Sequence, residues 1–447
     1  MSIGGIVSGL ETDKIIESLL KVEGIPQAML VNKKTNTESF VTALQALNTK
    51  LDSLKDMAAK VALGKSYDVW KGSSSNSSVS VATKEGASAT TLEFRVDKLA
   101  TGRSILSGAM ADASGLLNPD GAFTFTNGEG ETKVVFPDSE SLVDLAAAIN
   151  QDSSLGIKAT LVTTSEGSRL QLTSDETGAQ EGNFAVTSGQ GETNFTQIRQ
   201  SEDAQLTLWP GLNLPGSTVT SASNTFEEIS PGIALTVTSI SKDTDAPIVV
   251  NVVKDKEAIT KLGEDLVSQL NQVLEEIASR SKVTTEVVDG KTTVKAGIFA
   301  GDSMSRQITT LLQEAGLYPV DGKSPTTIGI SMDKDGKFAF DKERFAEALD
   351  KDPAETQRFL SQLAGRVESV GKTMSDPYEG SLTMRIQGQN NLVTEYGKQI
   401  ENWDIRLAQR RQTLVKMYTA MEVALSNLQA QSSRLGSQLG AMNGQGN

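Results

Sequence analysis

The sequence predicts a multidomain α+β protein with long coiled-coil helices at both termini, a mixed helix and hairpin domain, and two nested β-rich central domains. Two observations carry this prediction. A seven-residue apolar repeat runs through residues 393–442 and recurs in residues 30–61. Between them, residues 73–253 are dominated by short alternating strand patterns rich in Gly, Ser, Thr and Asn. Because strand patterns lie between helical ends, we expect the β domains to be inserted between two helical segments that meet.

The C-terminal repeat is uninterrupted by Pro over seven heptads. Seven-residue spacing keeps one apolar seam facing a partner helix in a left-handed supercoil, and the run is too long for an ordinary globular helix. We expect this seam to form an oligomer or filament interface. Its predicted interface residues are Val393, Ile400, Trp403, Leu407, Leu414, Met421, Leu428 and Leu435.

A second repeat lies near the N-terminus, with apolar residues in alternating steps of four and three. It is the natural partner for the C-terminal repeat, because a long seam without a partner frays in water. The alternative is that each repeat is an amphipathic helix of a globular bundle. The N-terminal residues predicted to belong to the interface are Leu30, Phe40, Leu44, Leu47, Leu51 and Leu54.

Changes in composition predict four nested domains. A polar run at residues 72–78 separates the helical start from the first strands, and a helix predicted at residues 141–150 is surrounded by strand patterns. The predicted division is a terminal coiled-coil domain (1–41 and 381–447), a mixed helical leg domain (42–72 and 254–380), a β-rich head domain (73–105 and 202–253), and an inserted β-rich head domain with one helix (106–201).

Within the leg domain, helical and hairpin patterns alternate. Apolar spacing predicts a helix through residues 259–277, and turn residues predict two hairpins. The predicted elements after that helix are a hairpin over 283–295 that turns on Asp289-Gly290, a helix over 303–314, a hairpin that turns on Asp335-Gly336, and a helix over 341–349.

Composition excludes several classes of function. A formal charge of −14 argues against a nucleic-acid or anionic-membrane surface, either of which needs a concentrated basic face. There is no Cys and no His, which removes thiol nucleophiles, imidazole acid–base catalysis and Cys/His zinc sites. No signal peptide or membrane span is visible in the first residues. We therefore expect no enzyme activity, no cofactor or metal, no nucleic-acid partner and no membrane insertion.

Candidate binding motifs also fail on spacing. Each Gly-Lys-Ser or Gly-Lys-Thr triplet lacks the earlier Gly that a phosphate-binding loop needs. Asp333-Lys334-Asp335-Gly336 resembles the start of a calcium loop, but Arg344 stands where a bidentate Glu is required. We expect a plain turn there.

Several short motifs stand in order along nearly the full length of the chain. They are Ser8-Gly9-Leu10-Glu11-Thr12-Asp13, residues 92–100, Ser230-Pro231-Gly232, residues 297–303, residues 328–330 with 335–341, and Met421-Glu422 with residues 428–432. In their order, these motifs resemble the family of the bacterial flagellar filament cap protein, also called flagellar hook-associated protein 2. Residues 141–150 with the strands that follow are similar to an insert found in flagellins.

The resemblance implies a secreted structural assembly factor at the distal tip of the filament. It implies a homo-oligomeric ring, beneath which exported flagellin folds and inserts. The implied partners are other copies of the chain, flagellin, the hook–filament junction proteins, a flagellar export chaperone and the type III export apparatus. Two alternatives are a hook–filament junction protein and a surface adhesin that binds host cells or mucin through its exposed β domains.

Overall fold

The structure is a computed structural model that describes residues 11–114, 122–139, 141–188, 191–192, 195–212, 214–288 and 291–443. The chain folds as two compact units. Unit 1 contains Met1–Ser66 and Thr260–Asn447, and unit 2 contains Tyr67–Ile259. The fold is mixed, with helical ends and a β-rich centre, as the sequence predicts.

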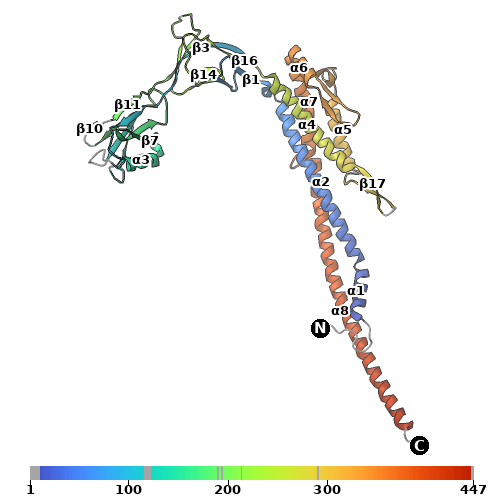
Figure 1. Ribbon diagram of the computed structural model, residues 1–447. Coiled ribbons are helices and arrows are strands. Elements are labelled where there is room, and N and C mark those ends of the chain that lie inside the picture. Colours follow the sequence, from blue (N-terminus) through green and yellow to red (C-terminus); the bar gives the residue numbers. More distant parts are fainter. Residues whose placement is uncertain are drawn as a thin grey trace. The chain divides into compact units, whose positions relative to one another are not determined.

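Unit 1 is built on long helices. Figure 1 shows α2 beside α7 and, farther along, beside α8. Its elements are α1 (Thr12–Glu23), α2 (Ile25–Ala62), most of α4 (Lys256–Ser281), β17 (Val283–Val288), β18 (Lys291–Ala296), α5 (Ser303–Leu317), the 3-10 helix η3 (Pro325–Ile328), β19 (Ile330–Met332), β20 (Phe338–Phe340), α6 (Lys342–Lys351), α7 (Pro353–Ser375) and α8 (Ser381–Asn443).

The first two helices are separated by a single residue. Gly24 ends α1, and its N–H donates to the carbonyl oxygen of Leu20. Pro26 lies in the first turn of α2, where its missing N–H costs no intrahelical bond. The helix predicted to start near Leu30 therefore starts at Ile25.

Helix α7 was absent from the sequence prediction, and it covers one half of α2. The two helices are antiparallel: the Ser361 hydroxyl donates to the Ala62 carbonyl oxygen at one end, and Gly371 approaches Leu51 and Lys55 at the other. A Cβ atom at Gly371 would lie 2.8 Å from Cβ of Lys55. Close approach of this kind requires the missing side chain.

The other predicted leg elements are present. Helix α5 begins at Ser303, and α6 begins after Asp341, whose carboxylate accepts from the Arg344 N–H at 3.0 Å. The turn between β19 and β20 is closed by Asp333, whose carboxylate accepts from two backbone N–H groups. The suspected calcium loop is thus a turn, as expected. Asp289-Gly290, the predicted turn of the other hairpin, lies outside the described residues.

Unit 2 contains two separate hydrophobic cores. The first lies between a five-stranded sheet of order β1-β16-β3-β12-β13 and a three-stranded sheet of order β14-β15-β2. All pairings in these sheets are antiparallel. The strands are β1 (Trp70–Ser74), β2 (Val79–Thr83), β3 (Thr90–Lys98), β12 (Ala204–Leu208), β13 (Thr218–Ser221), β14 (Thr225–Ser230), β15 (Ile233–Val237) and β16 (Ile248–Lys254), after the 3-10 helix η1 (Gly64–Tyr67).

The second core is formed by residues between Ile105 and Phe184, from two four-stranded sheets and one helix. Ser141 caps that helix, because its hydroxyl accepts from the Asp144 N–H at 3.1 Å. The elements are β4 (Ser104–Ser107), β5 (Phe123–Asn127), β6 (Thr132–Val135), α3 (Leu142–Gln151), η2 (Ser153–Leu155), β7 (Ile157–Thr164), β8 (Gly167–Ser174), β9 (Phe184–Ser188), β10 (Gly191–Glu192) and β11 (Phe195–Arg199).

Among the residues that the structure describes, no helix combines the length and the apolar composition needed to cross a membrane.

Candidate assembly interface

Helix α8 lies antiparallel to α1 and α2. Polar contacts between helix surfaces fix this register: Arg410 pairs with Glu23 at 2.9 Å, and the Gln27 amide donates to the Asp404 carboxylate. Between them, the Leu407 side chain lies 3.6 Å from where a Cβ atom of Gly24 would stand. The two ends of the chain are thus partners within one subunit.

The beginning of α8 is anchored by a largely buried ion pair. The Arg385 guanidinium donates two hydrogen bonds to the Asp302 carboxylate, one of them at 3.2 Å, and it stacks over the Phe40 ring at 5.1 Å from the ring centroid. Asp302 also caps α5 by accepting from the Ser305 N–H at 2.8 Å. One carboxylate therefore joins the starts of two helices, and this anchor was not foreseen from the sequence.

The electrostatics of Asp302 follow from these contacts. Burial disfavours the charged carboxylate, but the donors of Arg385 and Ser305 outweigh burial and hold the pKa of Asp302 below its usual range. The residue is therefore ionised at neutral pH, and its ion pair with Arg385 contributes to the stability of unit 1.

The fourteen predicted interface residues fall into three groups by burial. The first group is fully buried within the single chain, in the middle of α2. A side chain already buried within one subunit is unavailable to another subunit, so these residues stabilise the subunit core. They are Leu44, Leu47, Leu51 and Leu54.

The second group lies where α1 and α2 meet α8. Leu414 is buried at 2% exposure, and the others are partly buried. Their side chains hold the helical pair together while keeping part of their surface open. The partly buried residues are Leu30, Phe40, Val393, Ile400, Trp403, Leu407 and Met421.

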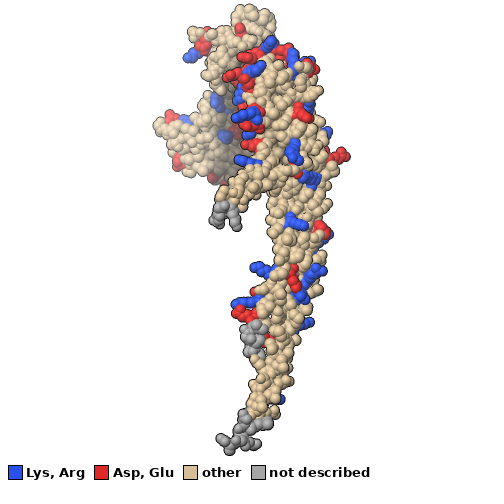
Figure 2. Space-filling view, turned by 90° about the vertical axis from the view of Figure 1, so that its right-hand side faces the viewer, with Lys and Arg blue, Asp and Glu red and all other residues tan. Residues whose placement is uncertain are grey.

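The third group is exposed at the end of α8. Leu428 and Leu435 keep 61% and 59% of their surface exposed, and Leu439 keeps 64%. Arg434 is the only charged residue between positions 424 and 443. Figure 2 shows few coloured side chains over this end of the helix. An exposed apolar row on a nearly uncharged helix is a typical contact surface.

A further exposed row was missed in the sequence. Val22, Ile25 and Met29 are large, apolar and exposed on α1 and the start of α2. Ile25 and Met29 are four residues apart in α2 and share one face, and that spacing was the available signal. The opening landmark Ser8-Gly9-Leu10 lies outside the described residues.

Matches to known protein families show to which family this chain belongs. The family "Flagellar hook-associated protein 2 C-terminus" matches residues 202–430, just over half of the chain. The chain belongs to the flagellar hook-associated protein 2 family. The family "Flagellar hook-associated protein 2 N-terminus" matches residues 8–103. The family "Flagellin hook IN motif" matches residues 122–176. The alternatives of a junction protein and an adhesin are not favoured by these matches.

Curated relatives carry the same family name. The lateral flagellar hook-associated protein 2 of Vibrio parahaemolyticus is 29% identical over 63% of this chain and 65% of its own length. The flagellar hook-associated protein 2 of Aeromonas caviae is 24% identical over 96% of this chain and 97% of its own length. The A-type protein of Pseudomonas aeruginosa is 24% identical over 99% of this chain and 98% of its own length.

A solved structure of the family has the same fold. The crystal structure of the D1-D2-D3 domains of the Escherichia coli flagellar cap protein matches with a TM-score of 0.58 at 18% identity. The match covers 78% of this chain and 99% of that chain. The hook-associated protein 2 family is thus supported by sequence and by fold.

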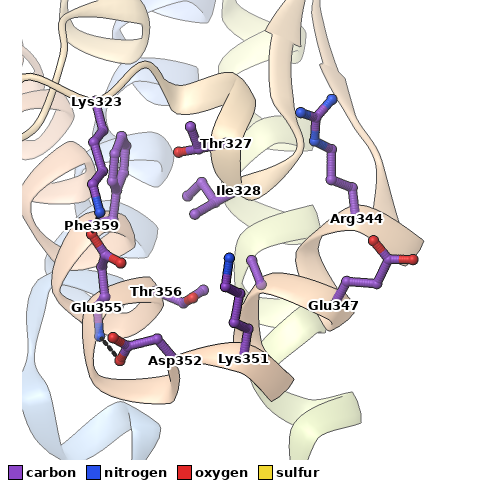
Figure 3. A pocket seen from close by; sticks show the side chains of 11 residues that line it. Lys323, Thr327, Ile328, Arg344, Glu347, Lys351, Asp352, Glu355, Thr356 and Phe359 are labelled. Atoms are coloured by element: carbon purple, nitrogen blue, oxygen red, sulfur yellow. Dashed lines mark hydrogen bonds and ion pairs between the residues drawn. The ribbon is translucent and has the colours of Figure 1, made fainter.

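Unit 1 has a hollow that is lined by several charged side chains. Figure 3 shows that its charged side chains come from α6, α7 and the loop before η3. Lys323 pairs with Glu355, and Asp352 accepts from the Glu355 N–H at 2.9 Å as the cap of α7. The carboxylates of Asp352 and Glu355 are occupied by these local contacts. Within the described residues, no cluster of acidic side chains could hold a metal ion.

Proposed function

We propose that this protein is a structural assembly factor that caps the distal end of the bacterial flagellar filament. Family membership supports a flagellar role, and the E. coli protein with the same fold is a flagellar cap protein. In this proposal, copies of the chain form a ring at the filament tip. Exported flagellin subunits fold and insert beneath the ring.

The observation that carries the proposal is the contrast between the two ends of α8. Its beginning is anchored by Asp302 and Arg385, whereas Leu428, Leu435 and Leu439 are exposed at its far end. A helix that is held at one end and apolar at the other suits a leg that reaches another molecule. The leg therefore contacts the filament and neighbouring copies through a coiled-coil seam.

The proposed partners are other copies of the chain, flagellin and the hook–filament junction proteins. Delivery to the tip uses the type III export apparatus and a flagellar export chaperone, as the family resemblance implies. The protein acts by positioning other chains, and no catalytic step is part of the proposal.

Two substitutions at the exposed end of α8 test this role. The variant Leu428→Asp with Leu435→Asp places carboxylates on the face that the proposed contact buries. An unpaired buried charge costs several kcal/mol, so the variant should fail to cap. Flagellin should then leak into the medium as monomer, and cells should lose motility. The thermal transition of the isolated subunit should stay unchanged, because both positions are exposed there.

A matched control uses the same helix. Ser426→Asp with Ser433→Asp adds two carboxylates at exposed positions of the same segment, away from the leucine row. It should support full-length filaments and normal swimming. The proposal is wrong if the double leucine variant also gives full-length filaments and normal swimming.

We also propose that the chain is divided into the four domains predicted from its sequence. The separate hydrophobic core between Ile105 and Phe184 supports an inserted domain near residues 106–201. A fragment of residues 100–203, which includes the strands of that core, should melt in one cooperative transition. A gradual loss of structure on heating would contradict independent folding.

A further inference from the structure

The hairpin of β17 and β18 has an apolar face that is open to solvent. Its register pairs Val283 with Ala296, Thr285 with Val294, and Val287 with Thr292. Paired and alternate residues of an antiparallel hairpin share one face, so these six side chains lie together. Val283 is 55% exposed, Val287 is 70% exposed and Val294 is 68% exposed. Figure 1 shows the hairpin extending from the end of α4.

Such a hairpin lacks the support that small sheets need. In the described part of the chain, this sheet consists of β17 and β18 alone. A two-stranded hairpin is marginally stable in water unless a third strand or another surface packs against it. Its open edges and exposed valines are the features by which strands associate with another chain. The hairpin therefore has the features of a docking element.

The base of the hairpin is held firmly. The Gly297 N–H donates to the Lys282 carbonyl oxygen at 3.0 Å, and the Phe299 N–H donates to the Arg280 carbonyl oxygen at 2.9 Å. A Cβ atom at Gly297 would lie 2.2 Å from that Arg280 oxygen, so Gly is required. Phe299 is buried, with its ring 6.0 Å from that of Phe40. A firmly held base lowers the ordering cost of docking.

We propose that this hairpin is an arm that docks on a neighbouring copy of the same chain in the cap. The inference rests on the proposed capping function. A closed ring of identical subunits uses two different surfaces per subunit, which a projecting arm and a separate receiving surface provide. The apolar face carries no charged residue. Because each copy has a net charge of −14, a neutral contact adds no repulsion between copies.

The size of the face also favours a contact within an assembly. Six short side chains bury only a few hundred square ångströms, well below the roughly 800 Å² per partner of a stable interface. The arm alone would not hold two free subunits together. It would add to the leg contacts once a ring places a neighbour beside it, as an effectively intramolecular contact.

Photo-crosslinking tests which molecule lies against this face. The chain has no Cys, so Val287→Cys is a unique attachment point for a benzophenone maleimide. Lys295→Cys is the matched control, because Lys295 lies on the opposite face of the same hairpin. Labelled subunits are added to filaments from a strain that lacks its own cap. After irradiation, products are identified by mass spectrometry, and filament growth is measured separately.

The expected product from Val287→Cys joins two copies of this chain, with a yield at least several-fold above that from Lys295→Cys. A product with flagellin would overturn the proposal and assign the arm to flagellin. Equal yields from both positions would overturn it too. If the labelled subunits support filament growth but Val287→Cys gives no product with another copy, the arm is wrong and the capping function stands. If unlabelled subunits fail to support growth, the capping function itself is wrong.

A second variant guards against interference by the label. Val287→Asp with Val294→Asp places two carboxylates on the apolar face, and Thr284→Asp with Thr293→Asp places two on the opposite face. The first variant should support several-fold less filament growth than the second. The two variants should have the same thermal transition, because both pairs of positions are exposed. Equal filament growth with the two variants would overturn the proposal that the hairpin is a docking arm.

Discussion

The middle of α2 and the end of α8 carry the same seven-residue repeat in opposite environments. Leu44, Leu47 and Leu51 are fully buried in the core of unit 1, whereas Leu428 and Leu435 are mostly exposed. Apolar spacing determines which side chains share a face of a helix. It does not determine whether that face meets its own chain or another one.

The difference arises from the neighbouring helices of unit 1. Helix α7 covers the second half of α2, and its Gly371 allows the two backbones to approach closely. The end of α8 runs beyond the part of the chain where contacts with α1 and α2 are described. The same pattern therefore gives a subunit core in one place and a candidate contact surface in the other.

The largest expected effect separates these two regions directly. Leu51→Ala should lower the free energy of unfolding of unit 1 by about 3–5 kcal/mol, because it leaves a cavity in a packed core. Leu435→Ala should change that free energy by less than about 0.5 kcal/mol, because the side chain is exposed. Chemical denaturation of both variants measures the contrast. Equal losses would remove the distinction between core and contact surface.

A second prediction concerns the anchored beginning of α8. Asp302→Asn keeps a good helix cap for α5 but removes the charge that faces Arg385. It should lower the free energy of unfolding at neutral pH by about 2–4 kcal/mol, since it leaves a largely buried Arg without its partner.

The pH dependence of that loss follows from the lowered pKa of Asp302. A carboxylate with a depressed pKa stabilises the folded state above its unfolded pKa, about 3.9 for Asp, and the contribution is lost as pH falls through the folded value. The difference between wild type and Asp302→Asn should therefore shrink below about pH 4. Denaturation curves from pH 7 down to pH 3 measure it. A difference that stays constant would contradict an ionic role.

The smallest expected effect tests the close approach of α7 to α2. Gly371→Ala should cost about 1–3 kcal/mol, because the new methyl group would clash with Lys55. Gly365→Ala on the same helix has open space and should stabilise by about 0.5–1 kcal/mol through higher helix propensity. Thermal denaturation gives both values. Similar shifts in the same direction would mean that α7 does not pack closely at Gly371.

Several elements of the fold were predictable from local patterns. The capped starts of α3 and α6, the hairpin of β17 and β18, and the turn at Asp333 follow from residues that lie close together in the sequence. Of the candidate interface, the seam residues were predictable as a set. Their division into buried and exposed members was not, because it depends on which distant helices cover each part of the repeat.

The sequence by itself determined the helical ends, the β-rich centre and the family, because periodicity and motif order are local properties of the chain. Only the tertiary structure decided which helix covers each part of the seam. Ser361 meets Ala62 and Arg385 meets Asp302 across long stretches of sequence. Burial depends on such distant neighbours, and no local pattern records them. The exposed end of α8 is therefore a property of how the helices pack.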